Sequence, residues 1–316
     1  VPLVFRALAL ARAVKQREDA AARAAAAKDE ATGGAGDDAT VAAAADGADT
    51  PSAAESPTPA ESSPATDGAS SAEPPKAVPP QYSSRKVFQF VHEIVTAMAG
   101  SFASISLNLF LQCAAEADRC GYKAIAYEFV SQAFIIYEDE LPDSKAQLKA
   151  LYLMVGCLLL ARGFDESDYD ALVTKTTQYA AKLLKKPDQC RMVAVCSHLF
   201  WSDAPDDAPA DPGAAKHFND ARRVLECLQR SLKIADACMN SSTAPVHLFV
   251  EILDHYVAHF EKRNPVITPK YISGLVALIN EHVDTADGAA AGDGLLQAHY
   301  RNTLARIKSK NIIPLE

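Results

Sequence analysis

Four residues that could bind a metal recur four positions apart on one expected helix: His247, Glu251, His255 and His259. Imidazole nitrogens and carboxylate oxygens are common zinc ligands. On an ideal helix such residues drift by about 40° per step, so two neighbours could chelate an ion but all four could not share one shell. Apolar residues between them predict a core face. We therefore favour a half-exposed polar flank over a metal site, and we expect no cofactor.

A second candidate is the run Glu138, Asp139 and Glu140 near the end of another expected helix. Two carboxylates can act as general acid and base when their environments separate their pKa values, usually in a pocket. No histidine accompanies these acids in the local sequence, so catalysis is not favoured. Acids are also unfavourable at the negative end of a helix dipole. The remaining interpretations of these acids are solvation and contact with a partner.

A basic run follows about one helix pair later, in "AAKLLKKPDQCRMV". Lys182, Lys185 and Lys186 are expected in the last turn of a helix that Pro187 ends, where positive charge suits the dipole. In an array of alternating direction, both charged runs end helices that point the same way. They could share one edge and pair with a second copy about a two-fold axis. Pairing within the chain, or plain solvation, is the alternative.

Other catalytic signatures are missing from the sequence. The stretch "GGAGDD" lacks the lysine and the following apolar helix of a phosphate-binding loop. No nucleophile elbow or H-E-x-x-H pair occurs. We therefore predict that the chain is not an enzyme.

The charge of the chain is unevenly distributed. Its net charge is -9, and residues 29–80 carry ten acids against one base, which leaves 30 acids and 30 bases elsewhere. A neutral remainder argues against a nucleic-acid-binding protein, which usually shows a basic surplus. Residues 29–83 are also poor in large apolar side chains. We expect them to form a disordered acidic linker rich in Ala, Ser and Pro.

Nearly all other residues follow helical periodicity, with breaks at Pro, Gly and Asp. From residue 84 onward, ten successive helices with short links predict an all-α protein, an α-solenoid of antiparallel pairs, with a compact irregular bundle as the alternative. Residues 1–28 would be its first helix and residues 84–310 its main part. The expected helices cover residues 2–28, 84–99, 104–120, a segment ending near Pro142, a segment from Asp143 to Gly163, 166–186, 188–201, 216–239, 244–263, 268–284 and 291–309.

The cysteines and the apolar runs indicate the cellular compartment of the protein. The seven cysteines lie mostly within apolar helical stretches and form no C-x-x-C pair, which is typical of buried thiols in a reducing compartment. The start is a poor signal peptide, and no run is long enough to span a membrane. These features predict a cytoplasmic location. The missing initial Met suggests that the sequence begins inside a longer chain.

Several stretches resemble the C-terminal part of the large retromer subunits, the vacuolar protein sorting-associated protein 35 family. They are "PLVFRALALA", "AYEFVSQAFIIYEDELPDSKAQL", "KLLKKPDQCRMVAVCSHLFW", "RVLECLQRSLKIADACM" and "HLFVEILDHYVAHFEKRN". The resemblance covers residues 1–28 and about 84–309. It implies a HEAT-like solenoid without enzymatic activity, which scaffolds a coat on the cytosolic face of endosomes for retrograde and recycling transport of membrane cargo.

The resemblance also implies partners. The family's C-terminal half wraps a small subunit with a phosphoesterase fold, vacuolar protein sorting-associated protein 29, and pairs with a second large subunit. In that pairing the family uses acids matching Glu138, Asp139 and Glu140 and lysines matching Lys182, Lys185 and Lys186. For the small subunit, Phe200 and Trp201 are candidate aromatic anchors, with burial in the core as the equal alternative. A different helical-repeat adaptor or transport receptor remains the second functional hypothesis.

Overall fold

The computed structural model of the chain describes residues 1–32, 82–201, 219–239, 246–285 and 294–314. In these ranges it contains α-helices, one 3-10 helix and no β-strand. Most of the predicted linker, residues 29–83, lies outside the described residues. The chain divides into two compact units, residues 1–13 with 84–316 and residues 14–83. In the second unit, Lys15 and Asp19 form an ion pair of 2.8 Å one turn apart on the first helix.

The helices follow one another with short breaks. They are α1 Pro2–Thr32, α2 Ser84–Ala99, α3 Ala103–Arg119, α4 Lys123–Asp139, α5 Ser144–Leu160, α6 Glu166–Ala180, α7 Lys186–Cys196, η1 Ser197–Phe200, α8 Ala221–Met239, α9 Val246–Glu261, α10 Pro269–Thr285 and α11 Gly294–Ser309. None of the helices in the described part of the chain is long and apolar enough to cross a membrane.

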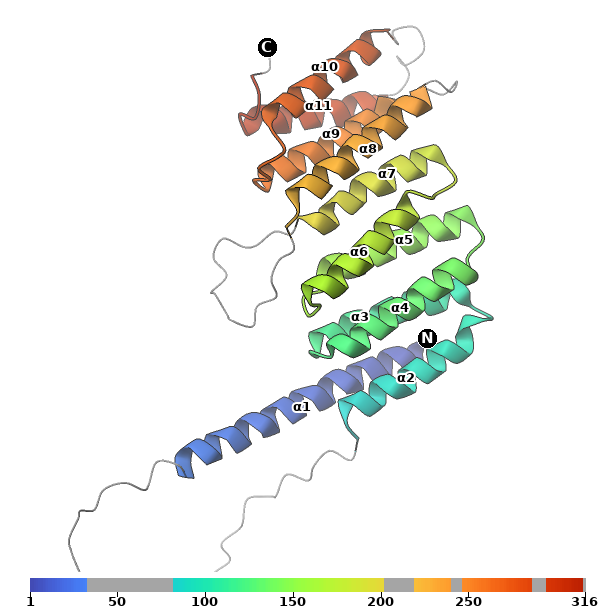
Figure 1. Cartoon of the computed structure of the whole chain (residues 1–316), viewed down its shortest axis with the longest axis vertical. Coiled ribbons are helices and arrows are strands. Elements are labelled where there is room, and N and C mark those ends of the chain that lie inside the picture. Colours follow the sequence, from blue (N-terminus) through green and yellow to red (C-terminus); the bar gives the residue numbers. More distant parts are fainter. Residues whose placement is uncertain (33–81, 202–218, 240–245, 286–293, 315–316) are drawn as a thin grey trace, which may run out of the picture. The chain divides into compact units, whose positions relative to one another are not determined.

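From α2 to α11 the helices stack in antiparallel pairs, which confirms the predicted α-solenoid (Figure 1). Sequential helices pack together, as α3 does with α4 and α7 with α8. Contacts also link α3 to α5, α5 to α7, α7 to α9 and α9 to α11, so the odd-numbered helices form a continuous layer. The even-numbered helices approach each other less closely. Each helix therefore packs against its partner and against neighbouring pairs, as expected for a solenoid.

Buried side chains between the layers form the core. On α4 a stripe of apolar residues spaced three or four positions apart is buried: Ala126, Phe129, Val130, Ala133 and Phe134. Phe129 packs near Phe88 and Phe110 at ring-centroid distances of 6.2 and 6.0 Å. In the first unit, α1 adds buried Val4, Leu8 and Ala11. Helical periodicity therefore located the core on these helices.

Apolar residues circle most of helix α5. Leu151, Met154 and Leu158 are buried, and α3, α6, α7 and η1 all contact the helix, so it is covered on several sides. Leu159 is 37%, Leu160 66% and Tyr152 45% exposed, so α5 also carries apolar surface outside the core.

The segment between α6 and α7 requires a second correction. Its three lysines were expected in the last turn of one helix, but α6 ends at Ala180 and α7 begins at Lys186. Pro187 occupies the first turn of α7, where it needs no backbone N–H donor. Lys186 therefore lies at the positive end of the α7 dipole, and the predicted favourable interaction with the dipole does not hold for it.

Asp143 is the N-cap residue of α5. Its side chain accepts a hydrogen bond of 2.9 Å from the Ala146 backbone N–H. We expect Asp143→Ala to lower the free energy of unfolding by about 1 kcal/mol, whereas Asp143→Asn should stay within a few tenths because both residues cap well. The measurement is urea unfolding followed by circular dichroism. Asp165→Ala is the control, since Asp165 precedes α6 without a side-chain capping bond. Equal losses in Asp143→Ala and Asp165→Ala would contradict the capping role.

Candidate interaction surfaces

The three acids lie where α4 ends. Glu138 and Asp139 form its last turn, and Glu140 follows as the C-cap residue with its backbone N–H bonded to the Ile136 carbonyl. All three residues are exposed. Among the described residues neither Asp139 nor Glu140 has a side-chain hydrogen bond or ion pair. This end of α4 therefore presents solvated negative charge, as the sequence indicated.

Glu138 differs from its two neighbours because it is bound within the chain. The Tyr179 hydroxyl donates a hydrogen bond of 2.6 Å to Glu138 Oε1, and Lys175 Nζ lies 3.3 Å from the same oxygen. The Tyr179 hydrogen bond, followed by Lys175 and Lys182, holds the pKa of the Glu138 carboxyl below its ordinary value, although partial burial acts in the opposite direction. No local sequence signal predicts this link between α4 and α6.

The lysines surround the turn from α6 to α7. Lys182, Lys185 and Lys186 are all exposed, and Lys186 donates a hydrogen bond of 3.1 Å to Gln189 Oε1. The hydrogen bond from Tyr179 to Glu138 joins the end of α4 to the end of α6, and Lys182 follows α6 two residues later. Charged side chains of both signs therefore lie near these two helix ends.

The two aromatic residues at the end of η1 differ in solvent exposure. Phe200 is 1% exposed, and the Arg223 guanidinium carbon lies 4.2 Å from its ring centroid. Trp201 is half-buried, and its indole N–H donates a hydrogen bond of 3.0 Å to the Lys262 carbonyl. Phe200 therefore has the buried environment that was its alternative interpretation. Trp201 keeps part of its ring accessible at a fixed orientation.

The histidines of α9 differ in burial and contacts. Among the described residues, no group of three or more His, Cys, Asp or Glu side chains is placed to hold a metal ion. The expectation of a half-exposed flank is wrong for His259, which is fully buried. The 3-10 helix η1 covers it: the His198 ring stacks on the His259 ring at 4.5 Å, and His198 Nε2 lies 2.8 Å from His255 Nδ1. The break after α7 that places η1 there has no clear sequence signal.

Hydrogen bonds define the protonation of His259. The Ser197 hydroxyl donates to the Ala194 carbonyl at 2.6 Å, so its oxygen accepts from His259 Nε2 at 2.8 Å. The other ring nitrogen, Nδ1, is buried without a hydrogen-bond partner. A proton there would have no acceptor. Burial, reinforced by His198, Lys262 and His255, lowers the pKa of His259 to about 2.

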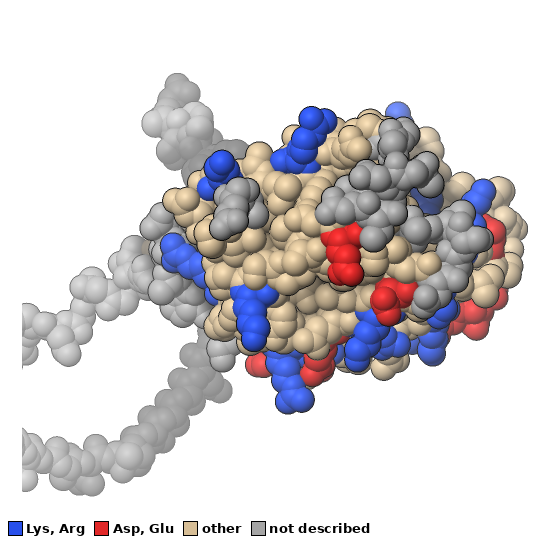
Figure 2. All heavy atoms as spheres, turned by 90° about the horizontal axis from the view of Figure 1, so that it is seen from above, with Lys and Arg blue, Asp and Glu red and all other residues tan. Residues whose placement is uncertain are grey.

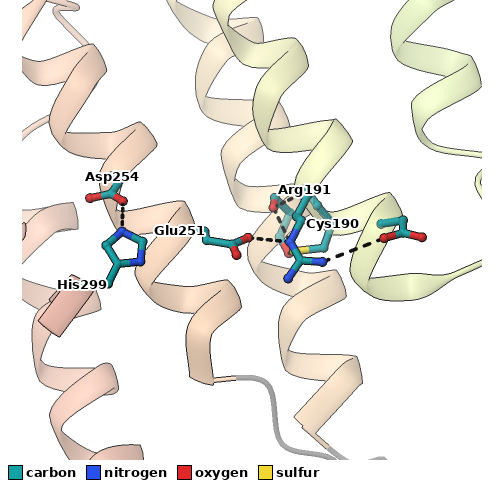
Figure 3. A network of polar contacts seen from close by, with 7 residues as sticks. Cys190, Arg191, Glu251, Asp254 and His299 are labelled. Atoms are coloured by element: carbon teal, nitrogen blue, oxygen red, sulfur yellow. Dashed lines mark hydrogen bonds and ion pairs between the residues drawn. The ribbon is translucent and has the colours of Figure 1, made fainter. Parts of the chain in front are cut away.

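Polar residues also connect the odd-numbered helices (Figure 3). Arg191 of α7 donates to Glu251 of α9 at 2.7 Å. Asp254 of α9 accepts from Thr303 of α11 at 2.7 Å and lies 2.6 Å from His299 Nε2. Arg191 therefore pairs between two helices. These contacts make a structural tie between successive repeats, and Glu251 is one of its members.

The cysteines show no sign of reactive chemistry. All seven are free, and six are buried. Burial raises the pKa of the Cys113 and Cys157 thiols to about 12 in each case. Because the thiolate is the reactive form, such thiols are poor nucleophiles at neutral pH. They act as small apolar side chains, as the sequence predicted.

The face seen from the α10 and α11 end shows no continuous basic surface (Figure 2). Lys and Arg side chains lie mainly around its margin, and Asp and Glu side chains are interspersed among them. Uncharged residues cover much of the area between. This distribution agrees with the neutral balance outside residues 29–80. It does not resemble the basic stripe of a nucleic-acid-binding face.

Comparison with known proteins identifies the family. A family model described as Vacuolar protein sorting-associated protein 35 matches residues 1–282. The chain is 44% identical over 211 residues to Vacuolar protein sorting-associated protein 35B of Arabidopsis thaliana, covering 65% of this chain and 25% of that protein. It is 41% identical over 201 residues to Vacuolar protein sorting-associated protein 35 of Schizosaccharomyces pombe, covering 63% and 23%. The chain thus spans about a quarter of the length of these relatives. It belongs to the vacuolar protein sorting-associated protein 35 family.

Proposed function

We propose that this chain is a non-enzymatic scaffold region of the retromer large subunit. It would bind the phosphoesterase-fold small subunit, vacuolar protein sorting-associated protein 29, and support endosome-to-Golgi and recycling transport of membrane cargo. Its place would be the cytosolic face of endosomes, reached through other proteins. The observation that carries this proposal is the family match over residues 1–282, together with a stack of helices whose surfaces offer contacts to partners.

We expect the purified chain and the purified small subunit to co-elute from a sizing column, earlier than either protein alone. A stacked solenoid offers an extended surface to a globular partner, so binding should survive dilution into the micromolar range. Trp201 is the partly exposed member of the proposed aromatic pair, so it is the candidate contact residue for the small subunit. Separate elution at every loading concentration would instead favour a different helical-repeat adaptor. A heat-denatured sample of the chain controls for non-specific association.

Self-association is the second part of the proposal. The acids at the end of α4 and the lysines between α6 and α7 lie on one edge and carry opposite charges. Under a two-fold axis the same edge of each copy would meet, with the acids of one copy facing the lysines of the other. Electrostatic complementarity of this kind contributes specificity and a faster association rate. The exposure of Asp139, Glu140, Lys182 and Lys185 supports this reading.

A further inference from the structure

Five side chains join the ends of α4 and α6, and we name them the α4–α6 clip: Phe134, Tyr137, Glu138, Lys175 and Tyr179. Its polar part is the hydrogen bond of 2.6 Å from the Tyr179 hydroxyl to Glu138 Oε1, with Lys175 Nζ 3.3 Å from that oxygen. A hydrogen bond to a charged acceptor is shorter and stronger than one between neutral groups. The clip therefore contains a charge-assisted contact between two helices of the same layer.

Aromatic packing holds this contact in place. The Tyr179 ring lies 4.6 Å from the Tyr137 ring and meets the Phe134 ring edge-on at 5.6 Å. Lys175 Nζ lies 5.5 Å from the Phe134 ring centroid and 5.8 Å from that of Tyr179. Tyr179 is only 7% exposed. Its hydroxyl is thus presented to Glu138 by a ring that has little freedom to move.

The clip separates Glu138 from the two acids that follow it. Asp139 and Glu140 point no side-chain oxygen at a donor among the described residues, whereas Glu138 is already bound by two groups of its own chain. To meet a lysine of another molecule, Glu138 would have to give up or share these partners. Asp139 and Glu140 have no such cost. The three neighbouring acids are therefore not equivalent.

We infer that Glu138 is a positioning residue that works inside the chain. With Tyr179 and Lys175 it fixes the end of α4, which carries Asp139 and Glu140, against the end of α6, which leads into Lys182 and Lys185. This inference rests on the proposed self-association, because two self-complementary edges match only when acids and lysines keep a constant spacing. Asp139 and Glu140 then supply the negative charge that a second copy meets.

The test compares variants of the whole chain. Tyr179→Phe keeps the aromatic ring and removes the hydroxyl, and Tyr169→Phe is its control, because Tyr169 donates to the Leu199 carbonyl at 3.1 Å nearer the start of α6. Hydrogen exchange at residues 136–141 should be faster in Tyr179→Phe and unchanged in Tyr169→Phe. Self-association by sedimentation velocity should weaken about three- to tenfold in Tyr179→Phe, with the same dependence on salt as the wild type.

A second comparison separates positioning from direct contact. Glu138→Gln keeps an acceptor for Tyr179 but removes the charge, and Glu140→Gln removes the charge of its neighbour. We expect Glu140→Gln to reduce the salt dependence of self-association and Glu138→Gln to leave it unchanged. Equal reductions in both variants would overturn the inference, as would unchanged exchange in Tyr179→Phe. Faster exchange in Tyr179→Phe, together with self-association that lysine reversal leaves intact, would support the clip while rejecting the proposed pairing.

Discussion

Replacing Lys182, Lys185 and Lys186 together with glutamate is expected to weaken self-association about tenfold or more at low salt. Each copy would then bring acids against the acids of its partner. Like charges placed opposite each other at an interface cost roughly several kcal/mol of binding free energy. The residual association should depend less on salt. Sedimentation velocity at ionic strengths from about 0.05 to about 0.3 M spans the range in which charges on the surface become screened.

A charge-swap experiment makes this prediction sharper. A second variant, Asp139→Lys with Glu140→Lys, should also fail to self-associate. Mixing the two variants should restore association, because each opposed pair of clusters then has opposite signs. Lys233→Glu, Lys270→Glu and Lys308→Glu, combined in one chain, make the matched control: these lysines are exposed, and the net charge changes equally. Failure of the mixture to associate, or an equal loss in the control, would discard the pairing proposal.

The second large effect is expected in the pH dependence of stability. His259 stays neutral in the folded chain, with a pKa of about 2, while in the unfolded chain it takes up a proton when the pH falls below its ordinary pKa of 6.5. The unfolded state therefore binds more protons as the pH falls through this value, and the folded state loses stability. Between about pH 7.5 and about pH 5.0 this single group accounts for a loss of about 2 kcal/mol.

His259→Gln isolates this contribution. The glutamine amide can still donate to Ser197, but it does not titrate. We expect the urea midpoint of the wild type to fall further than that of His259→Gln when the pH is lowered over this range. His247→Gln changes another histidine of α9, which is half-buried, and should keep the wild-type pH dependence. Parallel losses in the wild type and His259→Gln would show that His259 is not the group responsible. The wild type and His259→Gln both retain His198 and His255, the two histidines next to His259.

Periodicity and breaks in the sequence predicted most of the fold. The stripe on α4 and the cap at Asp143 follow from local rules, because side chains three and four residues apart share one helix face and an aspartate can bind free backbone N–H groups. The layered stacking follows from many helices with short links. Local signals were sufficient where the structure depends on neighbours in sequence.

The remaining features depend on contacts between residues far apart in sequence. Glu138 and Tyr179 are 41 residues apart, and no local rule pairs them. His259 is buried because η1 folds over α9, which the spacing of the histidines cannot reveal. At Lys186 two local rules compete, since Pro187 can end one helix or begin the next. The sequence singled out the six charged residues as candidates, but the hydrogen bond from Tyr179 to Glu138 is visible only in the structure.

The two layers differ in how closely their helices pack. Odd-numbered helices pack closely and are tied by contacts such as that between Arg191 and Glu251, whereas α4 and α6 meet through the long side chains of the clip. Under a bending load, we expect the odd-numbered layer to keep its length, while the spacing between the even-numbered helices changes. Elastic energy in residues 84–314 would accordingly be stored between the even-numbered helices. The contact of Tyr179 with Glu138 would set the stiffness of the link between α4 and α6.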